Sequence, residues 1–336
     1  MTRIGTDPAT EAPELESALR PLPDLDLRGA PWKPADLTPR TCPLCGSNGV
    51  DRHVRPDSLT VRECGCGLFF VSPAPGPLAL LEFYGRYFRT HEVTGTKNER
   101  LLADEILSTD GTSDLVMQEV SSRASLEGRR WLDVGCGHAP YLHWARLRGA
   151  SVTGIDLDPD AIEFARRHLG VPDVRVCSLT DLPGDETFDV ISMLDFIEHP
   201  REPRDFLLDA ARRLRRRGLL ILLTPNGRSA HGGPAPTVFR VDLEHLQYFS
   251  ASAVQTFAPS LGLEIEHLEA FGAPVLVGRA AGAGERRKTG QGFLRRAKAG
   301  LRSFPFARAL AVLAQSRAYR ALRDGDYHLL AILRKR

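Results

Sequence analysis

The sequence lacks a long apolar run. Its longest aliphatic stretch, Leu219–Leu223, has five residues, whereas a membrane-spanning helix needs about 20. The first 20 residues contain several acids and prolines and no apolar core, unlike a secretory signal peptide. These absences predict a soluble, cytoplasmic protein with no transmembrane segment.

The chain as a whole also lacks a large net charge, which is only +2. The balance hides an asymmetry: residues 279–336 hold 15 Lys and Arg against 3 acids, which leaves 29 basic and 39 acidic residues before them. The body of the protein is therefore acidic, and its last segment is strongly basic.

Cysteine is scarce, but four of the six residues lie close together, at Cys42, Cys45, Cys64 and Cys66. Without a secretion signal, such a cluster indicates metal ligands before disulfides. Four thiolates would leave no open coordination position, so the expected ion is a structural zinc. The second pair, Cys64-Gly-Cys66, has short spacing, and His53 is a spare ligand. Four reduced structural thiols remain the alternative.

From Arg129 onward, short apolar strands alternate with amphipathic helices, which is typical of a doubly wound α/β domain. We expect a mostly parallel seven-stranded sheet, with strands at Trp131–Val134, Ser151–Ile155, Val174–Val176, Phe188–Leu194, Gly218–Leu223, Leu263–Glu269 and Tyr327–Leu333.

The organisation expected for the chain has six parts. They are a disordered arm (1–38), a cysteine module (39–75), a helical substrate-side segment (76–127), the α/β domain (128–278), a basic helical insertion (279–326) and a closing strand (327–336).

The first strand of the α/β domain runs into a glycine-rich turn, Asp133-Val-Gly135-Cys-Gly137-His-Ala139-Pro140. A dinucleotide-binding fingerprint requires a small residue where Pro140 stands, and no Gly-Lys-Ser/Thr follows to form a phosphate loop. The acid before the turn suits a ligand with a cationic amino-acid end. Asp156, at the end of the second strand, suits ribose hydroxyls. The two motifs together predict an adenosyl ligand without phosphates.

Five motifs in this order resemble those of class I S-adenosylmethionine-dependent methyltransferases, most nearly the ubiquinone-pathway O-methyltransferases. They are Asp133-x-Gly135-x-Gly137, Gly154-Ile-Asp156, Leu182-Pro183, Phe188–Ile191 and Gly218–Asn226. The resemblance covers about residues 128–270 and the last strand. Similar methyltransferases often carry paired cysteines ahead of the catalytic domain.

The resemblance implies S-adenosylmethionine as cofactor and a set of residues that contact it. That set is Asp133, Gly135, Gly137, Ala139, Asp156, Leu157, Ser178, Leu179 and Met193. Two positions depart from the family pattern: Ala139 replaces a usual third glycine, and Ser178 replaces an acid that often contacts the adenine amino group. We expect these replacements to weaken cofactor binding rather than abolish it, since alanine is small and serine can still form a hydrogen bond.

The candidate catalytic residues are His199, His245 and Glu198. Asp195, Glu198 and His199 follow the fourth strand at helical spacing, and His245 follows the fifth. A histidine can remove the proton of an acceptor hydroxyl directly. Alternatively, a divalent metal can bind the hydroxyl and lower its pKa. The arrangement resembles the metal-binding set of small-RNA 2′-hydroxyl methyltransferases, so an active-site divalent metal stays open.

The basic insertion, residues 279–326, interleaves apolar side chains with Arg295, Arg296, Lys298 and Arg302. Such amphipathic segments can contact an anionic membrane surface peripherally. They can equally flank the acceptor site and attract a nucleotide- or lipid-linked acceptor. A dimer-forming or solvated helical pair is the plainest alternative.

The function expected from the sequence is O-methylation of a small hydroxylated acceptor, such as a sugar or a secondary metabolite. One rival is an NAD-type Rossmann oxidoreductase, which Pro140 argues against. The other is a non-catalytic nucleic-acid-binding module. That rival ranks last, because the cysteine module is small and aromatic residues make up only 7% of the chain.

Overall fold

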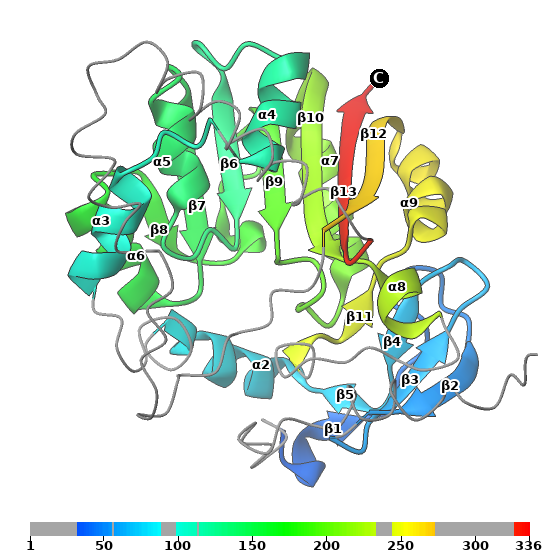
Figure 1. Cartoon of the computed structure of the whole chain (residues 1–336). Helices are drawn as coiled ribbons and strands as arrows, with labels where there is room; N and C mark the ends of the chain where they lie inside the picture. The colour runs from blue at the N-terminus through cyan, green and yellow to red at the C-terminus, as the bar shows by residue number, and fades with distance from the viewer. Residues whose placement is uncertain (1–31, 56, 89–98, 113, 233–243, 273–325) are drawn as a thin grey trace, which may run out of the picture.

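The computed structural model describes residues 32–55, 57–88, 99–112, 114–232, 244–272 and 326–336. Two layers of helices enclose a central sheet, and a smaller sheet lies beyond the ends to which the parallel strands point (Figure 1). The predicted insertion and most of the predicted arm lie outside the described residues. No helix in the described ranges is long and apolar enough to cross a membrane.

The central sheet has seven strands in the order β12-β13-β10-β9-β6-β7-β8, which confirms the predicted sheet. Strand β13 runs antiparallel to both of its neighbours, while the pairs among β10, β9, β6, β7 and β8 are parallel. The strands are β6 (Arg130–Val134), β7 (Ser151–Asp156), β8 (Val174–Val176), β9 (Phe188–Leu194), β10 (Leu214–Pro225), β12 (Leu263–Phe271) and β13 (His328–Lys335).

Alternate side chains of the central strands point to opposite faces, and each face buries its own core. Trp131 and Val190 belong to one apolar cluster, and the adjacent Leu132 and Ile191 belong to the other. The first core includes side chains of α3 (Glu99–Leu107), α4 (Leu115–Arg123), α5 (Pro140–Arg146) and α6 (Pro159–His168). The second includes side chains of α7 (Pro203–Arg213) and α9 (Ala251–Phe257).

Local signals set where these helices begin. Proline occupies the first turn of α5, α6 and α7, where its missing N–H costs no hydrogen bond. The Asp158 side chain caps α6 by accepting from the backbone N–H groups of Asp160 and Ala161. Within the expected helical segment, residues 76–127, α3 and α4 are separate helices, and Asp110 and Gly111 lie between them.

The cysteine module is a four-stranded antiparallel sheet in the order β11-β4-β3-β2. Three strands are local: β2 (Val50–Val54), β3 (Thr60–Glu63) and β4 (Phe69–Val71); the fourth, β11 (Gln247–Tyr248), comes from the α/β domain. The module is therefore joined to the domain by main-chain hydrogen bonds. In Figure 1, the helix α2 (Pro77–Tyr84) lies below the ends of the parallel strands and to the left of this sheet.

The end of the predicted disordered arm differs from the prediction. Trp32 is buried, Pro34–Asp36 form the short helix η1, and β1 (Leu37–Thr38) pairs with β5 (Ala74–Pro75). The ring of Trp32 packs against Phe83, with centroids 5.1 Å apart. An aromatic contact to a segment distant in sequence therefore orders residues that local composition marked as unstructured.

Candidate active site

The turn after β6 adopts the backbone conformation that its glycines allow. Gly135 and Gly137 have φ of 72° and 51°, and the backbone N–H groups of Gly135 and Cys136 both donate to the carbonyl of Ile155. A Cβ on Gly135 would lie 2.2 Å from the Phe196 ring, so only glycine fits. The turn is thus packed closely against the segment that follows β9.

Ala139 has φ of 61°, a left-handed conformation in which a side chain is strained. This explains why a glycine is usual at the position in the family that the motifs resemble. Alanine is tolerated here because it is fully buried in the first core cluster, where its methyl group packs.

Asp156 ends β7 and faces the glycine turn. One carboxylate oxygen accepts from the Gly137 N–H at 2.8 Å, and the other accepts from the Asp158 N–H at 2.9 Å. An ionised carboxylate can accept several hydrogen bonds, so a ligand hydroxyl could also donate to Asp156. The next residue, Leu157, is partly exposed.

Asp133 lies beneath the turn on β6 and is almost completely buried. The Ser192 hydroxyl donates to it at 2.5 Å, and the Trp131 indole N–H donates to that hydroxyl at 2.7 Å. Burial, assisted by the charge of Asp156, raises the pKa of Asp133 to about 7. A cationic group bound beside it would favour the ionised carboxylate.

The remaining predicted cofactor residues, Ser178, Leu179 and Met193, differ in how far they are buried. Ser178 is partly exposed and caps the short helix η3 (Leu179–Asp181), whose Asp181 side chain accepts from the Ser178 N–H at 2.8 Å. Leu179 and Met193 are buried in the second core cluster. Their side chains therefore shape the interior beneath this edge of the sheet.

The candidate catalytic residues converge. Glu198, His199 and His245 each offer an oxygen or nitrogen atom, and these atoms lie within 4.8 Å of one another. The first two sit in a turn after β9, and His245 precedes β11. The Leu246 N–H donates to the Glu198 carbonyl at 2.9 Å, which joins the two segments. Such a group could hold a divalent cation or exchange a proton.

Asp195, which the sequence placed with them, is not a member of this group among the described residues. The segment forms an irregular turn in place of the expected helical one, and Asp195 has φ of 48°. It remains exposed, yet the surrounding protein raises its pKa to about 6. This acid is therefore easier to protonate than an ordinary aspartate.

Burial sets the charge state of the group. Glu198 is fully buried, which raises its pKa to about 8. No well-aligned hydrogen bond from the described residues reaches either carboxylate oxygen, although the Thr224 hydroxyl is near enough to lower the pKa slightly. Burial and the neighbouring His245 hold the pKa of His199 well below its usual 6.5. His199 is therefore a neutral imidazole, the form that accepts a proton or binds a metal.

Two tyrosines complete the group and were missed by the sequence reasoning. The Tyr84 hydroxyl lies 2.7 Å from His199 Nδ1, and the Tyr87 hydroxyl donates to a Glu244 carboxylate oxygen at 2.9 Å. The helical spacing of apolar residues around Tyr84 predicts that it lies on the buried face of a helix. That spacing does not indicate which polar group a buried phenol contacts.

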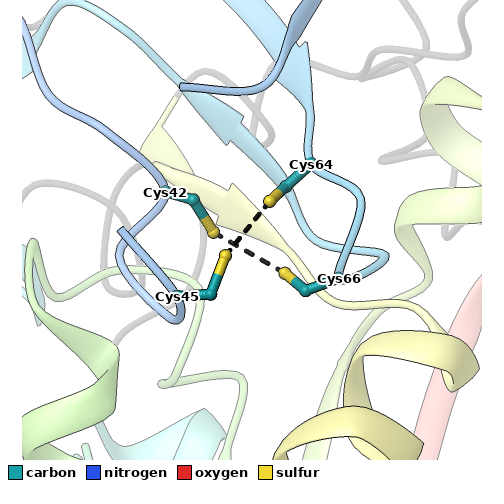
Figure 2. A group of neighbouring side chains, drawn as sticks. All are labelled: Cys42, Cys45, Cys64 and Cys66. Atoms are coloured by element: carbon teal, nitrogen blue, oxygen red, sulfur yellow. Dashed lines mark hydrogen bonds between the residues drawn. The ribbon is translucent and has the colours of Figure 1, made fainter. Parts of the chain in front are cut away.

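The four cysteines of the module form a compact cluster with all side chains pointing inward (Figure 2). The four sulfurs lie within 4.8 Å of one another, with Cys42 3.7 Å from Cys66 and Cys45 3.3 Å from Cys64. These distances exceed a disulfide bond of about 2.05 Å, and the thiols are free. His53 instead lies 3.2 Å from a ring nitrogen of His231.

The short second pair closes the cluster because its turn is tight. The Gly67 N–H donates to the Cys64 carbonyl at 2.9 Å, and Gly67 has φ of 92°. In the first pair, burial alone would raise the pKa of Cys45, but hydrogen bonds from Ser47 and the neighbouring thiols lower it to about 6. A thiolate, the form that binds metal, is thus accessible at neutral pH.

Comparisons with known proteins agree with this geometry. Residues 110–268 match a family model described as a methyltransferase domain. The ubiquinone biosynthesis O-methyltransferase of Schizosaccharomyces pombe, described as mitochondrial, is 32% identical over 118 residues, covering 33% of this chain and 43% of that protein. The enzyme of that name from Xanthomonas oryzae pv. oryzae is 39% identical over 114 residues, covering 32% and 47%. The chain therefore spans less than half the length of these relatives.

Solved structures give more distant likenesses. A Burkholderia thailandensis 1,6-didemethyltoxoflavin-N1-methyltransferase, with bound 1,6-didemethyltoxoflavin and S-adenosylhomocysteine, has a TM-score of 0.46 at 14% identity, covering 85% of this chain and 99% of that one. An S-adenosylmethionine-dependent methyltransferase from Archaeoglobus fulgidus has a TM-score of 0.44 at 18% identity, covering 70% and 98%.

The family match, the relatives and the strand order agree with the ordered motifs that carried the resemblance. Residues 110–268 therefore match a methyltransferase domain, and their motifs and strand order resemble those of the class I, S-adenosylmethionine-dependent type.

Proposed function

We propose that the protein transfers a methyl group from S-adenosylmethionine to a hydroxyl oxygen of a small acceptor. One observation carries this proposal: Phe196, in the turn that holds Glu198 and His199, packs against Gly135 of the glycine turn. The candidate proton-accepting group therefore adjoins the candidate cofactor turn, as an in-line displacement at the methyl group requires. The names of the matched relatives support an oxygen acceptor.

The residues of the turn fit the cofactor by their donor and acceptor chemistry. Asp133, buried beneath the turn, would face the amino-acid end of the cofactor, and the glycines would admit that end close to the backbone. Asp156 would accept from the ribose hydroxyls. Ser178 and Leu179 would border the adenine, and Leu157, Ala139 and Met193 would shape the walls. When bound, the cofactor supplies the electrophilic methyl group.

Removal of the acceptor proton falls to the histidines in this proposal. His199 is a neutral base, and His245 lies with its ring centroid 4.9 Å from that of His199. Either can accept a proton from a hydroxyl within hydrogen-bonding reach. The alternative is that Glu198, His199 and His245 together hold a divalent cation that lowers the pKa of the hydroxyl.

Isotope transfer tests the proposed reaction. The protein would be incubated with S-adenosylmethionine labelled with deuterium in its methyl group and with a pool of hydroxylated metabolites. The pool would include sugars, phenols and nucleotide- and lipid-linked sugars, because the basic charge of residues 279–326 favours an anionic acceptor. We expect a product with a deuterated methoxy group. Label on carbon or nitrogen alone, or no transfer to any member, would contradict O-methylation.

The Tyr84→Phe variant separates the two ways of removing the proton. If His199 binds a cation through Nε2, its Nδ1 carries the hydrogen and donates to the Tyr84 oxygen. Loss of that acceptor would weaken the metal, and we expect roughly 10-fold or greater loss in metal affinity. If no metal acts, the variant would change kcat and leave activity unaffected by chelators. Titration of chelator-treated enzyme with magnesium and manganese measures the difference.

We also propose that the cysteine module binds one structural zinc through Cys42, Cys45, Cys64 and Cys66. A tetrahedral site with Zn–S bonds of about 2.3 Å has sulfurs about 3.8 Å apart. The two measured separations, 3.3 and 3.7 Å, support this assignment with little rearrangement.

Elemental analysis checks the zinc proposal. We expect about one zinc per chain in protein purified without added metal, because four converging thiolates bind zinc tightly. The Cys66→Ser variant should lose most of it, whereas Cys177→Ser, outside the cluster, should retain it. A stoichiometry near zero, with all four thiols freely titratable, would refute the zinc site.

A further inference from the structure

The segment His245–Tyr248 lies between the cysteine module and the turn that carries Glu198 and His199. On one side, Gln247 and Tyr248 pair with β4, and the Val71 N–H donates to the Leu246 carbonyl at 2.8 Å. On the other side, the Leu246 N–H donates to the Glu198 carbonyl. The main chain beside His245 is thus held by two separate parts of the molecule.

Arg55, in the loop between β2 and β3, contacts this segment from the module. It is 2% exposed and forms a bidentate pair with Asp57, whose side chain is equally buried. The guanidinium directs its remaining nitrogen, Nη1, to the carbonyl of His245 at 2.7 Å and to the Tyr248 hydroxyl at 2.9 Å. Asp57 neutralises the charge, so the arginine acts as a fixed donor in an apolar setting.

Arg40 and Gln247 make a second link. Arg40 donates to the carbonyls of Val71 and Arg201, at 2.9 and 2.7 Å, and also to the Leu246 carbonyl. It donates in addition to the Gln247 side-chain oxygen at 3.1 Å. The Gln247 amide, fully buried, donates to the carbonyls of Ile197 and Pro200 at 2.7 and 2.8 Å. These two carbonyls flank Glu198 and His199, so the amide holds both ends of that turn.

We propose that Arg55, Arg40 and Gln247 are positioning residues of the candidate active site, and that the cysteine module is a structural part of that site. Arg55 holds the main chain at His245. Arg40, through Gln247, holds the turn of Glu198 and His199 in register with it. None of the three reaches the reacting atoms; they fix the separation of the groups that do. The expected effect on kcat rests on the proposed function. The expected effect on the positions of the histidine rings does not.

A test of the Arg55 link must replace both members of the buried pair, Arg55 and Asp57. Taking Arg55 alone would leave Asp57 as an unpaired buried charge and destabilise the fold. The double variant Arg55→Met, Asp57→Asn removes both charges and preserves an acceptor for the Leu59 N–H, which donates to Asp57 at 3.3 Å. The Gln247→Met variant tests the second link. Arg52→Met is the matched control, since Arg52 is exposed and lies on β2, three residues before Arg55.

Two readouts distinguish positioning from general stability. The first is the ring resonances of ¹³C-labelled histidine, with His245 and His199 assigned from single variants. We expect both rings to shift in the double variant and in Gln247→Met, and neither to shift in Arg52→Met. The second is kinetics with the labelled cofactor: a fall in kcat of about 10-fold or more, with cofactor affinity within about 2-fold of wild type.

The outcomes separate the failure of this inference from failure of the proposed function. Unshifted histidine rings in folded variants, checked by far-ultraviolet circular dichroism, would overturn the positioning role whatever the reaction proves to be. Shifted rings with unchanged kcat would overturn its catalytic consequence. If the wild type transfers no methyl group, the ring shifts still decide the geometric claim. Should the double variant fail to fold, Gln247→Met still tests the second link, and unshifted rings in that folded variant would overturn the positioning role of Gln247.

Discussion

The His245→Ala variant is expected to lower kcat by roughly 10² or more while leaving cofactor affinity unchanged. Its ring adjoins His199, and the ligand atoms of both lie within 4.8 Å of a buried carboxyl oxygen of Glu198. Loss of a general base costs about 10²–10⁴ in rate. Single-turnover kinetics with the acceptor identified by isotope transfer measures this directly, since it isolates the chemical step from product release.

The control for this prediction is His267→Ala. His267 lies on β12, partly buried beside Glu269, and is not a member of the candidate group. Its loss should leave kcat unchanged. His199→Ala should match His245→Ala if the two histidines act as a unit. Full activity in both single variants would place proton removal elsewhere.

The Asp156→Ala variant is expected to weaken binding of S-adenosylhomocysteine by roughly 10²-fold or more. Two hydrogen bonds from ribose to an ionised carboxylate contribute about 1.5–3 kcal/mol each. The same side chain also holds the N–H groups of Gly137 and Asp158, so its removal loosens the glycine turn. Isothermal calorimetry gives the dissociation constants.

Two further variants serve as controls for the Asp156→Ala variant. Asp156→Asn keeps one oxygen acceptor and should lose less affinity than alanine. Asp185→Ala, at an exposed acid in a loop, should bind as the wild type does. Equal affinity for Asp156→Ala and wild type would show that the end of β7 does not contact the ligand.

The sequence predicted the central sheet well because burial leaves a strong pattern there. Strands that are covered on both faces appear in the sequence as short apolar runs. The predicted end of each strand lies within a few residues of its end in the structure. The position of Asp156 followed from the same pattern, since it is the first polar residue after an apolar strand. The glycines of the turn predicted its position equally well, because a backbone with positive φ strongly favours glycine.

The contacts of the candidate site were less predictable because they join residues far apart in sequence. Tyr84 and His199 are separated by 115 positions, and Arg55 and His245 by 190. Periodicity assigns Tyr84 to a buried face but carries no information about its hydroxyl. The sequence does not distinguish a buried arginine from an exposed one. The link from the cysteine module to His245 is therefore visible only in the three-dimensional structure.

The expectation that Asp195, Glu198 and His199 share a helical face shows the same limit. Their spacing suits a helix, but the backbone turns at Asp195, with φ of 48°, and the group gathers without it. The close packing of Phe196 on Gly135 fixes this turn. Tertiary contact here overrides local spacing.

Calorimetric titration of the wild-type protein with S-adenosylhomocysteine, and in parallel with NAD⁺, tests the central claim most directly. The glycine turn, Asp133 and Asp156 predict one site per chain with micromolar affinity for S-adenosylhomocysteine and no measurable binding of NAD⁺. The absence of binding to S-adenosylhomocysteine, or tighter binding of the nicotinamide dinucleotide, would contradict the account.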